Sequence, residues 1–297
     1  MQHSMKKKKY IDKRNWKEYN NKLIKRGEFY LNPRFLNTWL QETKEMNQDK
    51  EGKPYLYPNS MIEFLGILHA KSFDYRALQG IVNVLSCKFD NFPVICYSQI
   101  CRRVNKINIK FTTNNQNLIV GVDGSGIKVS NRGDWMRKKW KVKKGWIKVV
   151  VMGDSKGNIV DIRVGNEDLN EGKSSRGMIR KNKKKVKKLL GDGLHDCKET
   201  FNLCNKLNID PVIKIRKNAS KKSRGSKLRK EKLKEYLKLG HKKWVKEKEY
   251  GLRWVCTEGI FSSVKRIFGE CVRSTKKKNM YHEAKLKFWA YNLLLNC

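Results

Sequence analysis

The chain has 297 residues, and its 68 Lys and Arg residues against 28 Asp and Glu residues give a formal net charge of +40. An excess of this size is tolerated when a polyanion neutralises it, which favours DNA, RNA or an anionic lipid as partner and argues against an ordinary metabolic enzyme. Part of the excess is equally explained by a Lys-rich composition. A hydrophobic content of 39% excludes a disordered basic tail.

Membrane spans and secretion signals are not predicted. Apolar stretches such as 61–68 fall short of the ~20 residues that a membrane-spanning helix needs. No apolar segment follows the basic residues 1–9, so a cytoplasmic protein is expected. None of the 8 cysteines belongs to a C-x-x-C pair, which favours free thiols over a zinc site.

The first 115 residues are predicted to be helical. Their helical segments cover 16–24, 35–46, 61–69, 75–85 and the residues after Ser98. Ser60 and Glu63 form a capping-box signature for the third segment, and Asp74 and Ser98 are predicted N-caps for the fourth and the last. The last segment carries Arg102 and Arg103, which fits a helix-turn-helix-like DNA-binding module. A helical lid packed on the next domain is an equal alternative.

From about residue 118, short β-branched runs alternate with helical stretches. The predicted strands are 118–122, 147–152, 159–164, 189–190 and 212–215, and the predicted helices are 174–188, 198–207, 227–239, 258–268 and 283–295. Residues 153–157 form a strong hairpin signal, where Asp154 and Asp161 are expected to face solvent. The order β-β-β-α-β-α-β-α predicts an α/β fold with a mixed sheet flanked by helices. The predicted domains are therefore 1–115 and 116–297.

Three acidic residues stand out by position. Asp123 ends an apolar strand, Asp192 lies between two glycines after another strand, and Glu258 begins a helix. Carboxylates placed there can meet at one edge of a sheet, and their hard oxygen atoms suit Mg²⁺ or Mn²⁺. Two such ions roughly 3.5–4 Å apart stabilise the attacking and leaving oxygens of an in-line displacement. Alternatively, the two aspartates cap turns and Glu258 only favours a helix N-terminus.

The residues around these acids resemble those of the DDE (Asp-Asp-Glu) transposases of prokaryotic insertion sequences, in particular insertion-sequence family five. The similar segments run over nearly the whole chain and include 15–27, 97–103, 122–129, 191–201, 216–219 and 250–270. The resemblance implies a ribonuclease H-like core with Asp123, Asp192 and Glu258 as catalytic residues that bind two Mg²⁺ or Mn²⁺ ions. It also implies a preceding helical DNA-binding region.

That family's activity is metal-dependent DNA cleavage at the ends of the element and strand transfer into target DNA. The implied partner is double-stranded DNA, both the terminal inverted repeats and the target. The resemblance further implies a homodimer in the synaptic complex, no membrane partner and a cytoplasmic, nucleoid-associated location. Two alternatives stay open at this point: a catalytically inactive DNA-binding remnant, and a ribonuclease H-like structure-selective nuclease or resolvase.

The last motif resembles the family signature Tyr-x2-Arg-x3-Glu-x6-Lys. In this chain Tyr250, Arg253, Glu258 and Lys265 stand in that order, with one extra residue between Arg253 and Glu258. The resemblance implies that the tyrosine, arginine and lysine bind DNA near the cut. A basic insertion at about 214–250 contains Trp244, which either stacks on an unpaired base or packs in the core.

Three features are set aside. Gly172-Lys173-Ser174 is similar to the end of a phosphate-binding loop, but the earlier glycine is missing and Glu171 would repel phosphate. Asp196 is assigned as a helix N-cap before residues 197–207. His195 is left out of the triad because a lone histidine is more often structural.

Overall fold

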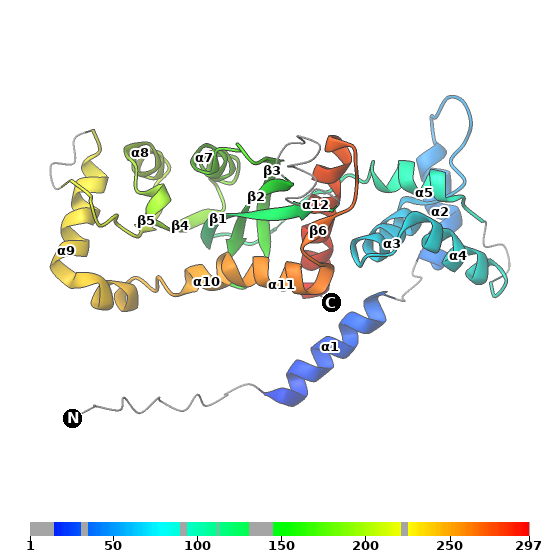
Figure 1. Ribbon diagram of the computed structural model, residues 1–297, viewed down its shortest axis with the longest axis horizontal. Helices are drawn as coiled ribbons and strands as arrows, with labels where there is room; N and C mark the ends of the chain where they lie inside the picture. The colour runs from blue at the N-terminus through cyan, green and yellow to red at the C-terminus, as the bar shows by residue number, and fades with distance from the viewer. Residues whose placement is uncertain are drawn as a thin grey trace, which may run out of the picture.

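The structure is a computed structural model that describes residues 15–30, 35–89, 94–111, 113–130, 145–220 and 225–296. Figure 1 shows a central sheet with helices on both faces, a cluster of helices at one end and a long basic helix at the other. The N-terminal helices are α1 (Trp16–Tyr30), α2 (Phe35–Asn47), α3 (Asn59–Ala70), α4 (Tyr75–Ser86) and α5 (Tyr97–Val104).

The strands form one mixed sheet in the order β3-β2-β1-β4-β5, with β6 also paired to β1. They are β1 (Leu118–Val129), β2 (Trp146–Asp154), β3 (Ile159–Asn166), β4 (Val186–Gly191), β5 (Asp210–Ile213) and β6 (Cys271–Val272). The first three strands are antiparallel neighbours, whereas β4 and β6 run parallel to β1 and β5 runs parallel to β4. This is the ribonuclease H-like arrangement that the sequence predicted.

The central strand β1 has a gap in its pairing. On the side away from β2, β4 pairs with β1 only as far as Gly121, and β6 begins pairing at Lys128. Among the described residues, no strand covers β1 on that side between these two points. We call residues 122–127 the open edge of β1.

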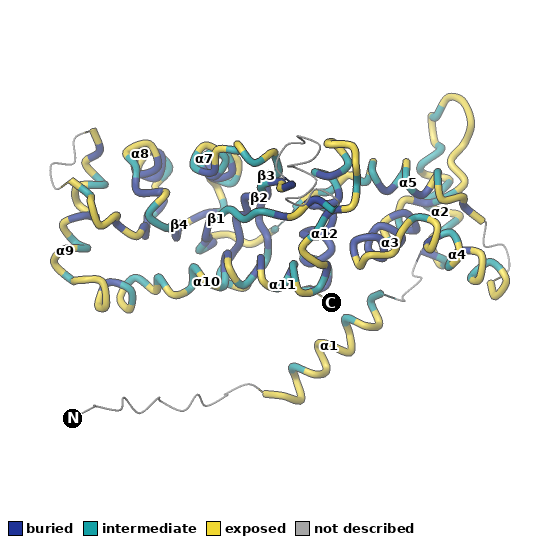
Figure 2. The backbone as a smooth tube through the Cα atoms, in the orientation of Figure 1, coloured by how far each residue is buried: buried dark blue, intermediate teal, exposed yellow. Residues whose placement is uncertain are grey.

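Helices cover both faces of the sheet, and Figure 2 shows the buried strands between them. The helices after β3 are α7 (Glu171–Lys181), α8 (Lys198–Lys206), α9 (Lys227–Glu247), α10 (Leu252–Cys256), α11 (Glu258–Phe268) and α12 (Lys277–Leu295), with a 3-10 turn η1 (Gly193–His195). Because side chains alternate along a strand, Val150 packs with α7 and α8, while Val149 and Val151 pack with α11 and α12.

One apolar core crosses the predicted boundary near residue 115. Leu65 of α3 and Ile100 of α5 belong to the same buried cluster as Phe261 of α11 and Phe288 of α12. His282 of α12 also bonds through Nε2 to the carbonyl oxygen of Val104, at 2.8 Å. The division into 1–115 and 116–297 stays a prediction, and helix α12 joins its two halves.

Several local predictions hold. Asp74 is the N-cap of α4, where its carboxylate accepts from the backbone N–H groups of Arg76 and Ala77. The hairpin at 153–157 connects β2 to β3. Helix α11 has the predicted bounds, whereas α9 continues to Glu247 through a break at Gly240, whose φ of 70° is outside the helical range.

Other local predictions are wrong. The capping box fails because α3 begins at Asn59, and both the backbone N–H and the hydroxyl of Ser60 donate to Glu42. Ser98 is not a cap either, since α5 begins at Tyr97. Helices α7 and α12 begin earlier than predicted, at Glu171 and Lys277, and α7 ends at Lys181 because the end of the predicted helix 174–188 belongs to β4.

Asp154 and Asp161 do not face solvent, contrary to prediction; they are 2% and 3% exposed. Asp154 accepts from the backbone N–H groups of Lys156 and Asn158, which stabilises the hairpin turn. Asp161 forms an ion pair with Lys181 at 3.1 Å. Burial is tolerated because each carboxylate has partners inside the fold.

Within the described residues, no helix is long and apolar enough to cross a membrane.

Candidate active site

The candidate site lies at the open edge of β1. Asp123 is the second residue of that edge, and its side chain is 22% exposed. Its Oδ1 accepts from the backbone N–H of Gly124 at 2.9 Å. Burial raises the pKa of the Asp123 carboxyl above its usual value; the N–H of Gly124 and the charge of Arg253 act against this, and repulsion from Glu171 and Asp192 adds to it.

Asp192 follows β4 directly, at the point where that strand leaves β1. Its carboxylate caps the turn η1 by accepting from the N–H of Leu194 at 2.9 Å. The turn is held from outside by Arg216, whose guanidinium donates to the carbonyl oxygens of Gly193 and Leu194. A capped and braced turn fixes where the second carboxylate lies relative to Asp123.

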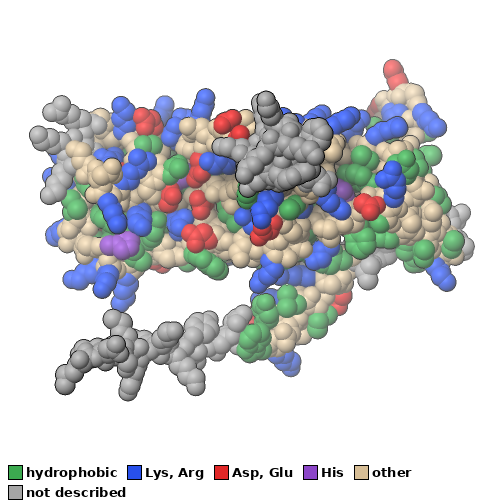
Figure 3. Space-filling view, in the orientation of Figure 1, with side chains coloured by type: hydrophobic (Ala, Val, Ile, Leu, Met, Phe, Trp, Pro, Cys, Tyr) green, Lys and Arg blue, Asp and Glu red, His purple; other side chains and the backbone are tan. Residues whose placement is uncertain are grey.

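Glu258, from a later part of the chain, also lies at the open edge of β1. It is the first residue of α11, and its side chain is 46% exposed. Arg253 of α10 links the two ends of the site: Nη2 pairs with Glu258 Oε1, and Nη1 lies 3.5 Å from Asp123 Oδ2. Figure 3 shows acidic side chains gathered over β1, β4 and α10 with Lys and Arg side chains around them.

Lys265 and Tyr250 extend the site. Lys265 lies two turns after Glu258 on α11 and donates from Nζ to the hydroxyl of Ser125 in the open edge, at 3.1 Å. Tyr250 donates its hydroxyl to the carbonyl oxygen of Gly191, at 3.0 Å, which ties the turn between α9 and α10 to the end of β4. Burial raises the pKa of Tyr250 to about 12, with Arg253 acting against it and the three carboxylates Asp192, Asp123 and Glu258 adding to it.

Trp244 does not present its ring to solvent. It is 3% exposed, and its ring centroid lies 5.0 Å from those of Tyr236 and Tyr250. Of the two readings that the sequence left open, core packing is the one observed. Trp244 therefore packs against the ring of Tyr250 inside the core.

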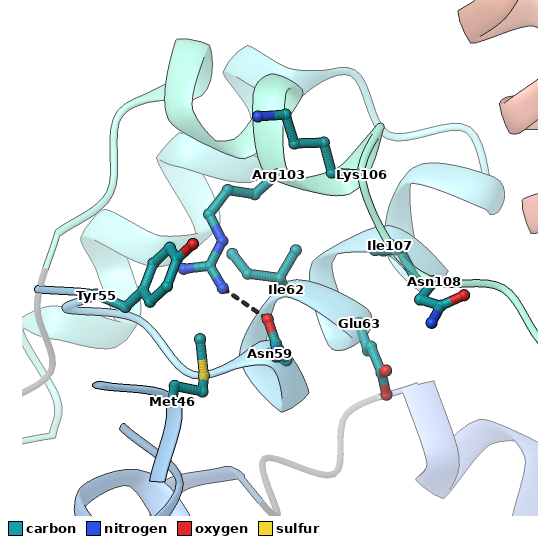
Figure 4. Close-up of a pocket in the computed structure, with 9 residues that line it drawn as sticks. All are labelled: Met46, Tyr55, Asn59, Ile62, Glu63, Arg103, Lys106, Ile107 and Asn108. Carbon is teal, nitrogen blue, oxygen red and sulfur yellow. Dashed lines mark hydrogen bonds between the residues drawn. The ribbon is translucent and has the colours of Figure 1, made fainter. Parts of the chain in front are cut away.

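The N-terminal arginines lie on α5, beyond α12 from the sheet in Figure 1. Arg102 is exposed. Arg103 donates to the carbonyl oxygen of Tyr57 at 2.7 Å and to Asn59 Oδ1 at 2.8 Å, and its guanidinium stacks on Tyr55. Figure 4 shows this arginine in a pocket of about 450 Å³ between α3 and α5. Arg103 thus braces the N-terminal helices.

Two residues at the site were not assigned from the sequence. Glu171 is 8% exposed and forms an ion pair with Lys148 at 3.1 Å between Oε2 and Nζ. His195 is fully buried in η1, with its Nε2 atom 4.0 Å from Glu171 Oε1. His195 comes near Asp123 because β4, which precedes it, pairs with β1. Glu171 comes near Asp123 because α7 begins beside β1.

Asp196 is the other acid of this loop, and its predicted role is wrong. The N-cap of α8 is Cys197. The carboxylate of Asp196 instead binds Arg229 of α9 through two contacts, 2.6 Å to Nε and 3.1 Å to Nη2. The loop after β4 is therefore anchored to the basic helix.

The oxygen atoms of Asp123, Asp192 and Glu258 are the donor type that Mg²⁺ and Mn²⁺ prefer. Among the described residues, no group of three or more His, Cys, Asp or Glu side chains is already arranged to hold a metal ion. Arg253 pairs with two of the three carboxylates. The donor chemistry of the three residues fits a divalent cation.

A ribonuclease H-like sheet with carboxylates at the open edge of its central strand defines a class of phosphoryl-transfer enzymes. The chain belongs to the transposase DDE domain family: residues 115–293 match a family described as "Transposase DDE domain", and residues 24–132 match a second family with the same description. The predicted resemblance to DDE transposases is thereby confirmed. The assignment to insertion-sequence family five stays a prediction.

Two solved transposase structures are similar to this chain. One is the piggyBac transposase synaptic complex with hairpin DNA, at 9% identity and a TM-score of 0.41, covering 85% of this chain and 70% of that chain. The other is a pre-cleavage Mos1 transpososome, at 9% identity and a TM-score of 0.23, covering 88% of this chain and 86% of that chain.

Proposed function

We propose that this protein is the transposase of an insertion sequence, which cleaves DNA at the ends of its element and joins the freed ends to target DNA. The observation that carries the proposal is the meeting of Asp123, Asp192 and Glu258 at the open edge of β1, linked through Arg253 and Tyr250. These residues come from three distant parts of the chain. Turn capping alone does not explain why Asp123 and Glu258 share one arginine.

In this proposal the three carboxylates hold two Mg²⁺ or Mn²⁺ ions. Divalent cations supply Lewis acidity, which activates a water or a 3′-hydroxyl and stabilises charge on the phosphate. The carboxylates place the reacting phosphate at the open edge of β1. Lys265, on the same face as Glu258, binds a neighbouring phosphate through Nζ.

Arg253 and Tyr250 have complementary roles. A phosphate of the substrate offers the guanidinium of Arg253 an alternative anion, so DNA binding draws the arginine from the carboxylates. Tyr250, in the turn before α10, is held by the carbonyl oxygen of Gly191 at the end of β4. Terminal inverted repeats and target DNA are the proposed substrates, and a homodimer brings two ends together. The region 1–115, with Arg102 on its surface, is the proposed end-recognition part.

Asp123→Asn tests the proposal, with Mn²⁺ and a duplex that carries the DNA flanking the gene on each side. The wild-type protein is expected to nick this duplex and join it to a second DNA, and to stop when EDTA removes the metal. Asp123→Asn should lose at least about 100-fold in cleavage rate because the substituted amide no longer supplies a charged metal ligand. Gel analysis of end-labelled DNA measures both steps.

Asp168→Asn is the matched control, since it makes the same chemical change at an exposed aspartate and should cleave normally. Binding without cleavage by both the wild type and Asp123→Asn would show an inactive DNA-binding remnant. Cleavage that ignores the end sequence but requires branched DNA would show a structure-selective nuclease instead.

A further inference from the structure

Glu171 is a buried acid placed against the open edge of β1. It is the first residue of α7, which Asn170 caps by accepting from the N–H of Lys173. A Cβ atom added to Gly124 would collide with Oε2 of Glu171. The carboxylate therefore rests on the backbone of the residue that follows Asp123, and only a glycine there permits this approach.

The two acids reach β1 from its opposite faces. Asp123 points to the face of α10, where Arg253 reaches it, and Glu171 comes from the face of α7. Because β4 has ended at Gly191, no strand separates them at this position within the described part of the chain. The repulsion that Asp123 receives from Glu171 exceeds the repulsion from Asp192.

The histidine beside Glu171, His195, is buried without a hydrogen bond to any described residue. His195 is fully buried, and within the described residues neither of its ring nitrogens makes a hydrogen bond. Its Nε2 faces Glu171 Oε1 at 4.0 Å, which is too long for a hydrogen bond. Buried nitrogens without partners are costly in a fold, and this one is directed at the carboxylate of Glu171.

A pocket gives access to this carboxylate. It has a volume of about 390 Å³, and its lining includes Glu171, Lys148, Arg176 and Leu194. The side chain of Lys148 is 28% exposed, so its ammonium group has room to turn toward solvent or a phosphate. An ion can therefore replace the ammonium group as the counter-charge of Glu171.

We infer that Glu171 is a fourth carboxylate of the divalent-cation centre, binding from the face opposite Arg253 and Glu258, with His195 lining the same ion position. The inference rests on the proposed function, and it adds a ligand that the three-acid motif does not contain. The competing explanation is a purely structural ion pair between Glu171 and Lys148. The two explanations predict opposite effects of Lys148 on metal affinity.

Calorimetric titration of the full-length chain with Mn²⁺, without DNA, separates them. Glu171→Gln is expected to weaken Mn²⁺ binding by about ten-fold or more. Lys148→Met is expected to tighten it, because the competing ammonium charge is gone. Unchanged affinity in Glu171→Gln, or weakened affinity in both variants, would overturn the inference in favour of the structural pair.

Asp161→Asn is the matched control: Asp161 is a buried acid with one lysine partner, Lys181 at the other end of α7. Its Mn²⁺ affinity should equal that of the wild type, and thermal melting should show all variants folded. Asp123→Asn separates a failure of this inference from a failure of the proposed function. If Asp123→Asn abolishes Mn²⁺ binding while Glu171→Gln binds normally, Glu171 is not a ligand but the proposed metal centre stands. If both variants bind Mn²⁺ normally, the proposed metal centre itself is wrong.

A second measurement needs no substitution. With Fe²⁺ in place of Mn²⁺, ascorbate and peroxide generate hydroxyl radicals at the bound ion, and these cut the nearby backbone. Cuts are expected both near residues 123–124 and near 170–172. Cutting at the first position without the second would contradict a role for Glu171 in holding the ion.

Discussion

Arg253 sets the charge balance of the site at the scale of single residues. Its guanidinium pairs with Asp123 and Glu258, while Lys148 pairs with Glu171 on the other face. These cations partly neutralise carboxylates that would otherwise repel one another, because close like charges destabilise a partly buried site. In the proposed site, a metal ion would compete with the arginine for the same oxygens.

Replacing Arg253 by alanine should raise Mn²⁺ affinity without DNA by about three-fold or more, because the competing charge is removed. The same variant should bind element-end DNA more weakly and cleave it more slowly, since one phosphate contact is lost. Calorimetry with Mn²⁺ and gel-shift assays with DNA measure the two effects separately.

Arg253→Lys serves as the control, since it keeps the charge but not the two-pronged geometry. Its metal affinity should stay close to that of the wild type. A loss of Mn²⁺ affinity in Arg253→Ala would contradict the competition and indicate that the arginine organises the carboxylates for metal.

At the scale of elements, helix α9 is fastened to the loop that carries Asp192. The fastening is the pair Arg229–Asp196, in which the carboxylate is fully buried and the arginine is 13% exposed. Asp196 also accepts from the backbone N–H of Arg216 at 3.1 Å. A single buried carboxylate thus connects α9, the loop after β4 and the residues after β5.

Arg229→Leu should lower the free energy of unfolding by about 3 kcal/mol, because it leaves the buried charge of Asp196 without its main partner. Urea denaturation followed by tryptophan fluorescence measures the loss. Adding Asp196→Asn to this variant should recover part of the stability, since the unpaired charge is removed as well.

Lys230→Leu is the comparison, because Lys230 is exposed on the next position of α9 and should change stability by less than about 0.5 kcal/mol. If both leucine variants lowered the free energy of unfolding equally, the Arg229–Asp196 pair would contribute no more to stability than an exposed lysine.

At the scale of the whole molecule, the N-terminal helices and the sheet share a core. A side chain at Gly66 of α3 would meet Leu286 of α12, and α12 itself packs on β3. Helix α12 is therefore buried from both sides, and Ala284, Leu286 and Phe288 are fully buried. Removing the N-terminal helices would therefore expose a large apolar surface of α12.

A fragment of residues 116–297 should consequently be less stable than the full chain and prone to aggregate, although it contains all the proposed catalytic residues. Thermal melting and size-exclusion chromatography of both proteins check this. A fragment that melts at the same temperature as the full chain, as a monomer, would support two independent domains with a boundary near residue 115.

Sequence patterns predicted the strands of this molecule better than its local caps. The hydrophobic runs at 118–122, 147–152 and 159–164 correspond to β1, β2 and β3, because alternation and β-branched residues report directly on burial. The capping box at Ser60 failed because Glu42, distant in sequence, supplied a stronger partner. Whether a residue caps a helix depends on which other polar groups the fold brings near its side chain.

Some residues of the candidate site could likewise be predicted from the sequence, and others could not. Asp192 and Glu258 could be chosen from the sequence because they stand at the end of β4 and the start of α11. Asp123 was chosen because the sequence predicted a strand ending at residue 122; in the structure β1 continues to Val129, and Asp123 lies within it. Glu171 could not be chosen, since its place against Gly124 depends on how α7 packs on the sheet. Trp244 was equally suited to a base or a core until the packing around Tyr250 was known.

By itself, the sequence determined the family and the order of the main strands and helices, and it proposed the three acids, because these depend on composition, periodicity and ordered motifs that survive without tertiary contacts. Only the tertiary structure decided that Arg253 joins Asp123 to Glu258, that Glu171 and His195 stand beside them, and that α12 unites the two halves. The physical reason is that charge neutralisation and burial depend on distances between residues far apart in the chain, and folding alone sets those distances.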